Sequence, residues 1–83
     1  MRGLVIKMTL QQLKYALMVA NTGSMNEAAK KLFVSQPSLS AAVKELESEM
    51  QISLFSRTSK GVHIIPEGSK FLSYAWQIIN QVE

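Results

Sequence analysis

The stretch SMNEAAKKLFVSQPSLSAAVKELESEM, residues 24–50, predicts two short helices joined by a tight turn. The second helix, expected over 35–50, has two unlike faces. One face carries apolar residues at helical spacing, namely Leu39, Val43, Leu46 and Met50. The other offers small or polar side chains in its first turns, namely Gln36, Pro37, Ser38, Ser40, Ala41 and Lys44. A helix that is anchored on one side and polar at its exposed N-terminal end is suited to the major groove of DNA, which admits an α-helix.

Capping signals mark where the two helices begin. Ser24 and Glu27 match the S-x-x-E capping box, in which each side chain accepts a hydrogen bond from the other residue's backbone N–H. Ser35 is expected to cap the second helix, with Pro37 tolerated in its first turn because an amide there has no partner within the helix. Glutamates crowd the C-terminal half of this helix and would repel phosphates, so we expect only its N-terminal half to approach DNA.

The segments on either side predict a helix and a hairpin. A helix is expected from Thr9 to Asn21, with a buried stripe of Leu10, Leu13, Leu17 and Ala20. Two β-prone runs, 52–57 and 62–65, flank a glycine-containing loop and predict a β-hairpin with Arg57 and Lys60 near its tip. Such a basic tip is either a wing that reaches phosphates or a minor groove, or an ordinary solvated turn.

A final helix is expected to begin at Pro66, with Glu67 in its first turn. It carries a wide apolar stripe, formed by Phe71, Leu72, Ala75, Trp76, Ile78, Ile79 and Val82. Because so small a domain has little core to absorb this stripe, we expect the helix to pair with the same helix of a second copy. The alternative is that the stripe folds back onto the helix predicted over 9–21.

Composition indicates one small ordered domain. The 83 residues are 47% hydrophobic and 18% charged, and contain no cysteine, which excludes disulfides and fits the cytoplasm. No apolar run approaches the roughly 20 residues of a membrane-spanning helix, and residues 1–7 lack the features of a secretory signal. The net charge is +3, but residues 1–35 carry +4 and residues 36–83 carry −1. This basic excess permits nucleic-acid binding, and Lys30 and Lys31 either meet phosphates or remain solvated.

The residue types argue against an enzyme and against a metal or other cofactor site. The chain has one histidine, His63, and no aspartate, and no nucleophile motif is recognisable. His63 has no neighbour at metal-ligand spacing, and the five methionines are better explained as core filler. The remaining alternative to a DNA-binding domain is a winged-helix module that binds proteins and not DNA.

Residues 9–68 resemble the N-terminal domain of LysR-type transcriptional regulators. The matching segments are LQQLKYALMVANTGSMNEAAKKL, FVSQPSLSAAVKELESEM and ISLFSRTSKGV, followed by Gly68. The resemblance implies a mainly α fold in which a winged helix-turn-helix, three helices plus a small β-hairpin wing, occupies 8–65. A long linker and dimerisation helix would follow at 66–83, truncated by the end of the chain, and a separate effector-binding domain would be absent from it. Residues 1–7 would form an N-terminal extension, with Met8 as the natural start.

The resemblance also implies which residues contact DNA. These are Ser35, Gln36, Pro37, Ser38 and Ser40 in the recognition helix, and Arg57, Thr58 and Lys60 in the wing. This chain has Ala41 where the family often has arginine, Ala16 in place of a usual phenylalanine, and Gln51 in place of a usual glycine. With no arginine in the first turns of the recognition helix to bind guanine, we predict a preference for A·T-containing half-sites. The implied partners are an inverted-repeat DNA operator in the bacterial cytoplasm, a second copy of the chain, and an effector bound by the missing domain, with no membrane.

Overall fold

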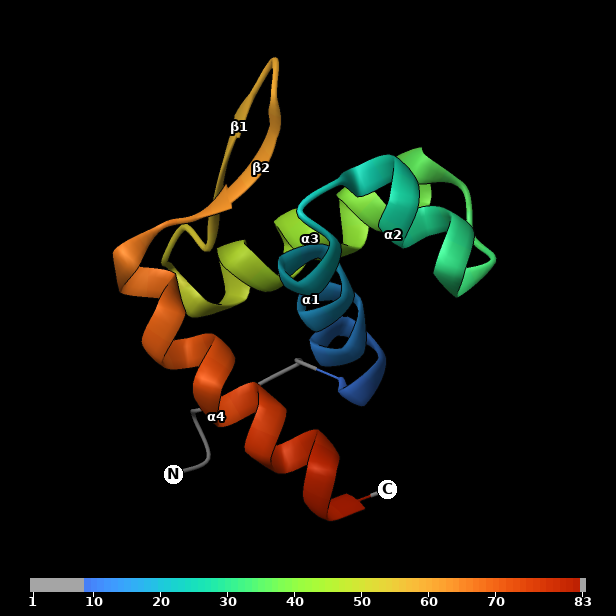
Figure 1. The fold of residues 1–83 in the computed structure, drawn as a ribbon. Coiled ribbons are helices and arrows are strands. Elements are labelled where there is room, and N and C mark those ends of the chain that lie inside the picture. Colours follow the sequence, from blue (N-terminus) through green and yellow to red (C-terminus); the bar gives the residue numbers. More distant parts are fainter. Residues whose placement is uncertain (1–8, 83) are drawn as a thin grey trace.

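The computed structural model describes residues 9–82, with the side chain of Val82 excepted, so the predictions about residues 1–7 and Met8 lie outside it. Along the chain it forms α1 (Leu10–Thr22), α2 (Met25–Leu32), α3 (Gln36–Met50), β1 (Phe55–Thr58), β2 (Gly61–Ile64) and α4 (Pro66–Val82). Helix α1 packs against α2, α3 and α4 and is the central element (Figure 1). The hairpin β1–β2 rises from the side of α3, and α4 runs from its base past α1. This mainly helical fold with one hairpin is the predicted one.

Helix α1 begins with a complete capping box. The Thr9 hydroxyl accepts from the N–H of Gln12 at 3.1 Å, and the Gln12 side chain accepts from the N–H of Thr9 at 3.0 Å. The box predicted for α2 is only half formed. The Ser24 hydroxyl accepts from the N–H of Glu27, but the N–H of Ser24 donates to the Thr22 hydroxyl at 3.3 Å. The predicted hydrogen bond from the N–H of Ser24 to the Glu27 side chain is therefore replaced by the bond to Thr22, and that half of the predicted capping box was wrong.

The buried stripe of α1 differs from the predicted one. Leu13 is buried as expected, but Leu10 is 42% exposed, and the fully buried neighbours of Leu13 are Ala16 and Val19. Leu17 and Ala20 lie only partly buried at the margin of the core. Because α1 contacts three other helices, its buried surface is wider than one stripe. Small residues such as Ala16 allow the close approach that a central helix requires.

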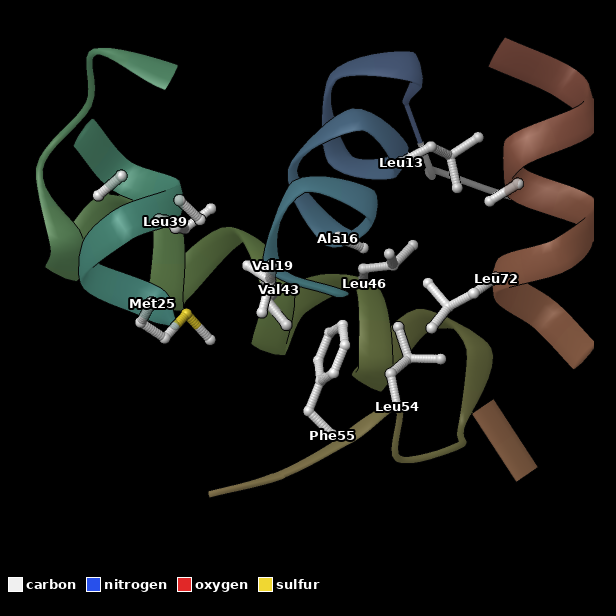
Figure 2. Close-up of a cluster of buried hydrophobic side chains, with 13 residues drawn as sticks. Leu13, Ala16, Val19, Met25, Leu39, Val43, Leu46, Leu54, Phe55 and Leu72 are labelled. Atoms are coloured by element: carbon white, nitrogen blue, oxygen red, sulfur yellow. The ribbon is translucent and has the colours of Figure 1, made fainter. Parts of the chain in front are cut away.

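The core lies where the four helices and the start of the hairpin meet (Figure 2). Helix α3 contributes Leu39, Val43 and Leu46, each almost fully buried, as its spacing predicted, while Met50 is half-buried. In Figure 2 the ring of Phe55 points from the hairpin toward α3. Burial of a leucine side chain stabilises a fold by about 1.5–3 kcal/mol, so these anchors hold α3 firmly along one face.

The hairpin is a tight antiparallel pair. Phe55 pairs with Ile64 and Thr58 with Gly61, which leaves two residues in the turn. The first strand was predicted from residue 52 but begins at Phe55. The backbone N–H groups just before Phe55 already have hydrogen-bond acceptors at the end of α3. The N–H of Ile52 donates to the carbonyl of Glu47, and the N–H of Leu54 donates to the Glu47 carboxylate. These N–H groups are therefore not available for the hydrogen bonds that would extend β1 toward residue 52.

Helix α4 divides its apolar stripe between the core and the surface. Leu72 and Ala75 are buried within this chain, and Phe71 and Ile79 are partly buried. Trp76 and Ile78 remain exposed. The helix therefore does pack on α1, as the alternative interpretation held, and leaves the rest of the stripe uncovered. No helix in residues 9–82 is long and apolar enough to cross a membrane.

Gly68 brings α4 close to the base of the hairpin. A Cβ atom at this position would lie 2.7 Å from the Cα of Leu54, which is shorter than any ordinary carbon contact. The N–H of Ile65, just before α4, donates to the carbonyl of Leu54 at 2.8 Å. These two contacts set the point at which α4 leaves the domain.

Candidate nucleic-acid interface

The start of α3 is exposed and its cap is the predicted one. The Ser35 hydroxyl accepts from the N–H of Ser38 at 3.2 Å and donates to the Ser38 hydroxyl oxygen at 2.9 Å. Pro37, Ser38 and Ala41 are exposed, while Gln36 and Ser40 are half-buried. Since the opposite face of α3 is anchored in the core, these small side chains form a firm, accessible surface.

The hairpin is held against α3 by side chains of the helix. The Arg57 guanidinium donates from Nη2 to the Ser40 hydroxyl at 2.7 Å. Two turns further along α3, the Glu47 carboxylate accepts from the N–H groups of Leu54 at 2.7 Å and Phe55 at 3.3 Å. Glu47 therefore serves the scaffold, and the expectation that the acidic half of α3 does not approach DNA stays a prediction.

The second strand of the hairpin is attached on its other side. The N–H of Val62 donates to the carbonyl of Gly23 at 3.0 Å, in the turn between α1 and α2. Gly61 has a φ of 129°, and a Cβ there would lie 2.8 Å from the Gly23 carbonyl oxygen. Glycine is thus required at position 61 by both the backbone conformation and the close approach. With both strands attached, the position of the hairpin relative to α3 is set before any ligand binds.

A polar cleft lies between the start of α2, the start of α3 and the hairpin. It brings together Gln36 from the recognition helix and Arg57, Thr58 and Lys60 from the wing, which sequence analysis had named from separate segments. Ser24 and Asn26, which sequence analysis did not propose, also line it. The N-terminus of α2 opens on the same cleft, and a helix N-terminus favours anions. Its capping signal at Ser24 could have pointed to this role.

The other predicted lysines lie outside the cleft. Lys30, Lys31 and Lys44 are exposed and are not among the residues that line it. The Lys30 ammonium lies 3.8 Å from the Glu27 carboxylate, a surface ion pair. Lys44 is on α3, one turn after Ser40, and so stays close to the exposed start of the helix. In residues 9–82 no three His, Cys, Asp or Glu side chains gather as a metal site would require.

Helices α2 and α3 are joined by a tight turn, and the exposed start of α3 is flanked by the basic hairpin β1–β2. This arrangement defines a winged helix-turn-helix domain. The model of bacterial regulatory helix-turn-helix proteins of the lysR family matches residues 10–69, and the chain belongs to this family.

Curated relatives of this chain are transcriptional regulators. It is 42% identical over 76 residues to a probable RuBisCO transcriptional regulator of Trieres chinensis, covering 92% of this chain and 25% of that protein. It is 37% identical to the HTH-type transcriptional regulator TfdT of Cupriavidus pinatubonensis, covering 92% of this chain and 33% of the relative. The chain therefore spans a quarter to a third of the length of these relatives.

Solved structures agree with the fold in detail. The DNA-binding domain of CbnR, solved in complex with DNA, superimposes with a TM-score of 0.87 at 36% identity, covering 90% of this chain and 86% of that one. The DNA-binding domain of BenM, in complex with benA site 1 DNA, gives 0.86 at 39% identity, covering 90% of this chain and 87% of that one. These matches confirm the predicted family and the winged-helix architecture.

Proposed function

We propose that this chain is the sequence-specific, double-stranded DNA-binding domain of a bacterial transcriptional regulator. The observation that carries the proposal is the shared cleft in which Gln36, at the exposed start of α3, lies beside the basic residues of the hairpin. The solved relatives CbnR and BenM, of similar fold, are described as complexes with DNA. Helix α3 would enter the major groove while the wing meets the backbone or the adjacent minor groove.

The exposed side chains of α3 suggest how the sequence is read. Gln36 can donate to N7 and accept from N6 of adenine, a bidentate pairing that identifies an A·T base pair. Pro37 and Ala41 can pack on thymine methyl groups, and Ser38 can bond bases or phosphates. Lys44 and the cleft residues Arg57, Thr58 and Lys60 would contribute phosphate contacts. An operator containing A·T pairs in each half-site follows from this set.

We further propose that the domain acts as a homodimer joined through α4. Trp76, Ile78 and Tyr74 are exposed on this helix at 57%, 41% and 57%. An apolar groove on the Trp76 side of the helix is lined by Trp76 together with Leu17, Met18, Leu32 and Ile79. A second copy would cover this surface and present two copies of α3 to an inverted repeat. Effector binding and cytoplasmic location would belong to the full-length regulator.

DNA binding is tested first by retention on heparin and by gel shift with random duplex DNA at low salt. Retention with a steep salt dependence is the expected result, because each phosphate contact releases counterions. Lys60→Ala should weaken binding to all sequences alike and lower the salt slope by about one unit. Lys70→Ala, which removes an exposed lysine on α4 outside the cleft, is the matched control and should leave the slope unchanged. A chain that binds neither heparin nor DNA would favour the protein-interaction module.

A further inference from the structure

Ser40 and Arg57 are joined more directly than their separate places in the sequence suggest. They lie 17 positions apart, one on the recognition helix and one on the first strand of the hairpin. Ser40 is half-buried on the side of α3 that faces the hairpin, where Gln36 and Glu47 also lie one and two turns away. The 2.7 Å distance from Nη2 to the hydroxyl oxygen is short for such a bond.

This contact determines the hydrogen-bonding polarity of Ser40. A serine hydroxyl can donate one hydrogen bond and accept others, whereas a guanidinium group can only donate. Ser40 must therefore accept from Arg57, and its own O–H remains to be donated outward. The positive charge beside the hydroxyl disfavours the approach of a second donor, such as an amino group. Ser40 is thus suited to acceptors of the major groove, which are guanine O6 and N7, adenine N7 and thymine O4.

Ser38 offers a matched comparison on the same helix. Its hydroxyl oxygen accepts from the Ser35 hydroxyl at 2.9 Å, so its polarity is set by a neighbour within the cap and not by the hairpin. Ser38 is exposed and its hydroxyl is bonded within the cap of α3, whereas the Ser40 hydroxyl is bonded to Arg57 of the hairpin. The two serines therefore lie two positions apart but belong to different hydrogen-bond networks.

DNA binding would strengthen the bond between Ser40 and Arg57. In the free chain the guanidinium group is exposed, so water competes for its N–H groups. When a duplex covers this surface, water is excluded and a charge-assisted hydrogen bond gains strength. The remaining N–H groups of Arg57 are then available to phosphate oxygens at the wall of the groove.

Building on the proposed function, we propose that Ser40 and Arg57 form one reading unit, in which Arg57 is a positioning residue that fixes Ser40 as a hydrogen-bond donor to a base acceptor. The wing then contributes to sequence selectivity through the recognition helix, in addition to any phosphate contact of its own. Selectivity at the base pair opposite Ser40 depends on both side chains, whereas selectivity due to Ser38 does not depend on Arg57.

The test compares DNA sequences selected from a random duplex pool by the wild-type chain and by Ser40→Ala, Arg57→Met, Arg57→Lys and Ser38→Ala. Loss of Ser40 should relax the discrimination against cytosine, whose N4 amino group is a donor, by up to about tenfold at one position of the half-site. Arg57→Met should relax the preference at that same position and also weaken binding overall. Arg57→Lys, which still donates to Ser40, should retain the preference. Ser38→Ala should leave that position unchanged.

Thermal unfolding of each variant verifies that the fold is retained, and Arg57→Lys and Ser38→Ala provide readouts if one of the other variants fails to fold. The proposal is overturned if Arg57→Met weakens all sequences equally and keeps the base preference that Ser40→Ala removes. It is also overturned if Arg57→Lys loses that preference as fully as Arg57→Met does. A wild-type chain that selects a DNA sequence whose base preferences are all unchanged by Ser40→Ala contradicts the reading unit alone, whereas a chain that binds no DNA, or that selects no sequence, contradicts the proposed function itself.

Discussion

Helices α3 and α4 each bury one face in the same core, yet their exposed faces are of opposite character. The exposed start of α3 presents short groups, namely Pro37, Ser38 and Ala41. Helix α4 presents large side chains on both flanks of its buried row, Tyr74 and Ile78 on one side and Trp76 on the other. Short polar groups leave room for base edges and can bond to them, whereas large apolar groups are favoured only when another apolar surface removes them from water. The difference supports the two proposals made above, a nucleic-acid partner for α3 and a second copy of the chain for α4.

The sharpest way to break this comparison is to remove the apolar character of α4. The double variant Trp76→Gln and Ile78→Gln keeps the net charge and uses a good helix former, so only the apolar surface is lost. We expect it to sediment as a monomer and to lose about 100-fold in affinity for an inverted repeat, because the second half-site no longer binds intramolecularly. Binding to a single half-site should be unchanged and is the internal control. A variant that still dimerises and still prefers inverted repeats would contradict the assignment of α4.

The second prediction concerns the reading face of α3. Gln36→Ala should weaken binding to the preferred site by about 1–3 kcal/mol and remove the preference for adenine, because a bidentate pair is lost. Sedimentation should be unaffected, since Gln36 is remote from the exposed face of α4. Gln11→Ala, an exposed glutamine in the first turn of α1, is the control and should bind DNA like the wild type. A fall in the affinity of Gln36→Ala for A·T-containing half-sites, down to its affinity for G·C-only half-sites, would support the proposed contact. An unchanged A·T preference would refute it.

The smallest effect is expected where α3 ends. Gln51 has a φ of 56°, a left-handed conformation in which a side chain is strained and glycine is not. Gln51→Gly should therefore raise the free energy of unfolding by up to about 1 kcal/mol, measured by denaturant or thermal unfolding. Phe33, at the end of α2, shares this conformation with a φ of 59° and is 93% exposed, so Phe33→Gly should behave alike. A loss of stability in both variants would show that these side chains make contacts that outweigh the backbone strain.

Sequence analysis predicted α3 and its surroundings well because the signals there are local. The spacing of Leu39, Val43 and Leu46 determines a buried face within one helix, and the cap at Ser35 involves residues three positions apart. The hairpin was predicted by the same kind of local signal, and only its first strand was drawn too long. The side chain of Glu47 decided that boundary, and nothing in the strand's own residues indicates such a competitor.

Predictions failed where the outcome depends on what packs against an element. The stripe of α1 was misplaced because a helix in contact with three others buries more than one row of residues. The stripe of α4 was assigned to a partner as a whole, but Leu72 and Ala75 lie in the core of the chain itself. Periodicity identifies an apolar face and does not say which surface covers it. Tyr74, which is exposed one turn before Ile78, lies just outside the predicted stripe.

Helix positions, the N-cap residues Ser24 and Ser35, and family membership were thus determined by the sequence alone, because each depends on residues within a few positions of one another or on a continuous motif. The candidate interface was assembled only by the tertiary structure. Arg57 meets Ser40 and Val62 meets Gly23 across long separations in the chain, and these contacts exist because the buried leucines bring α3, the hairpin and the α1–α2 turn together. Such polar contacts leave no periodic trace in a sequence, since a single donor and a single acceptor suffice to make them.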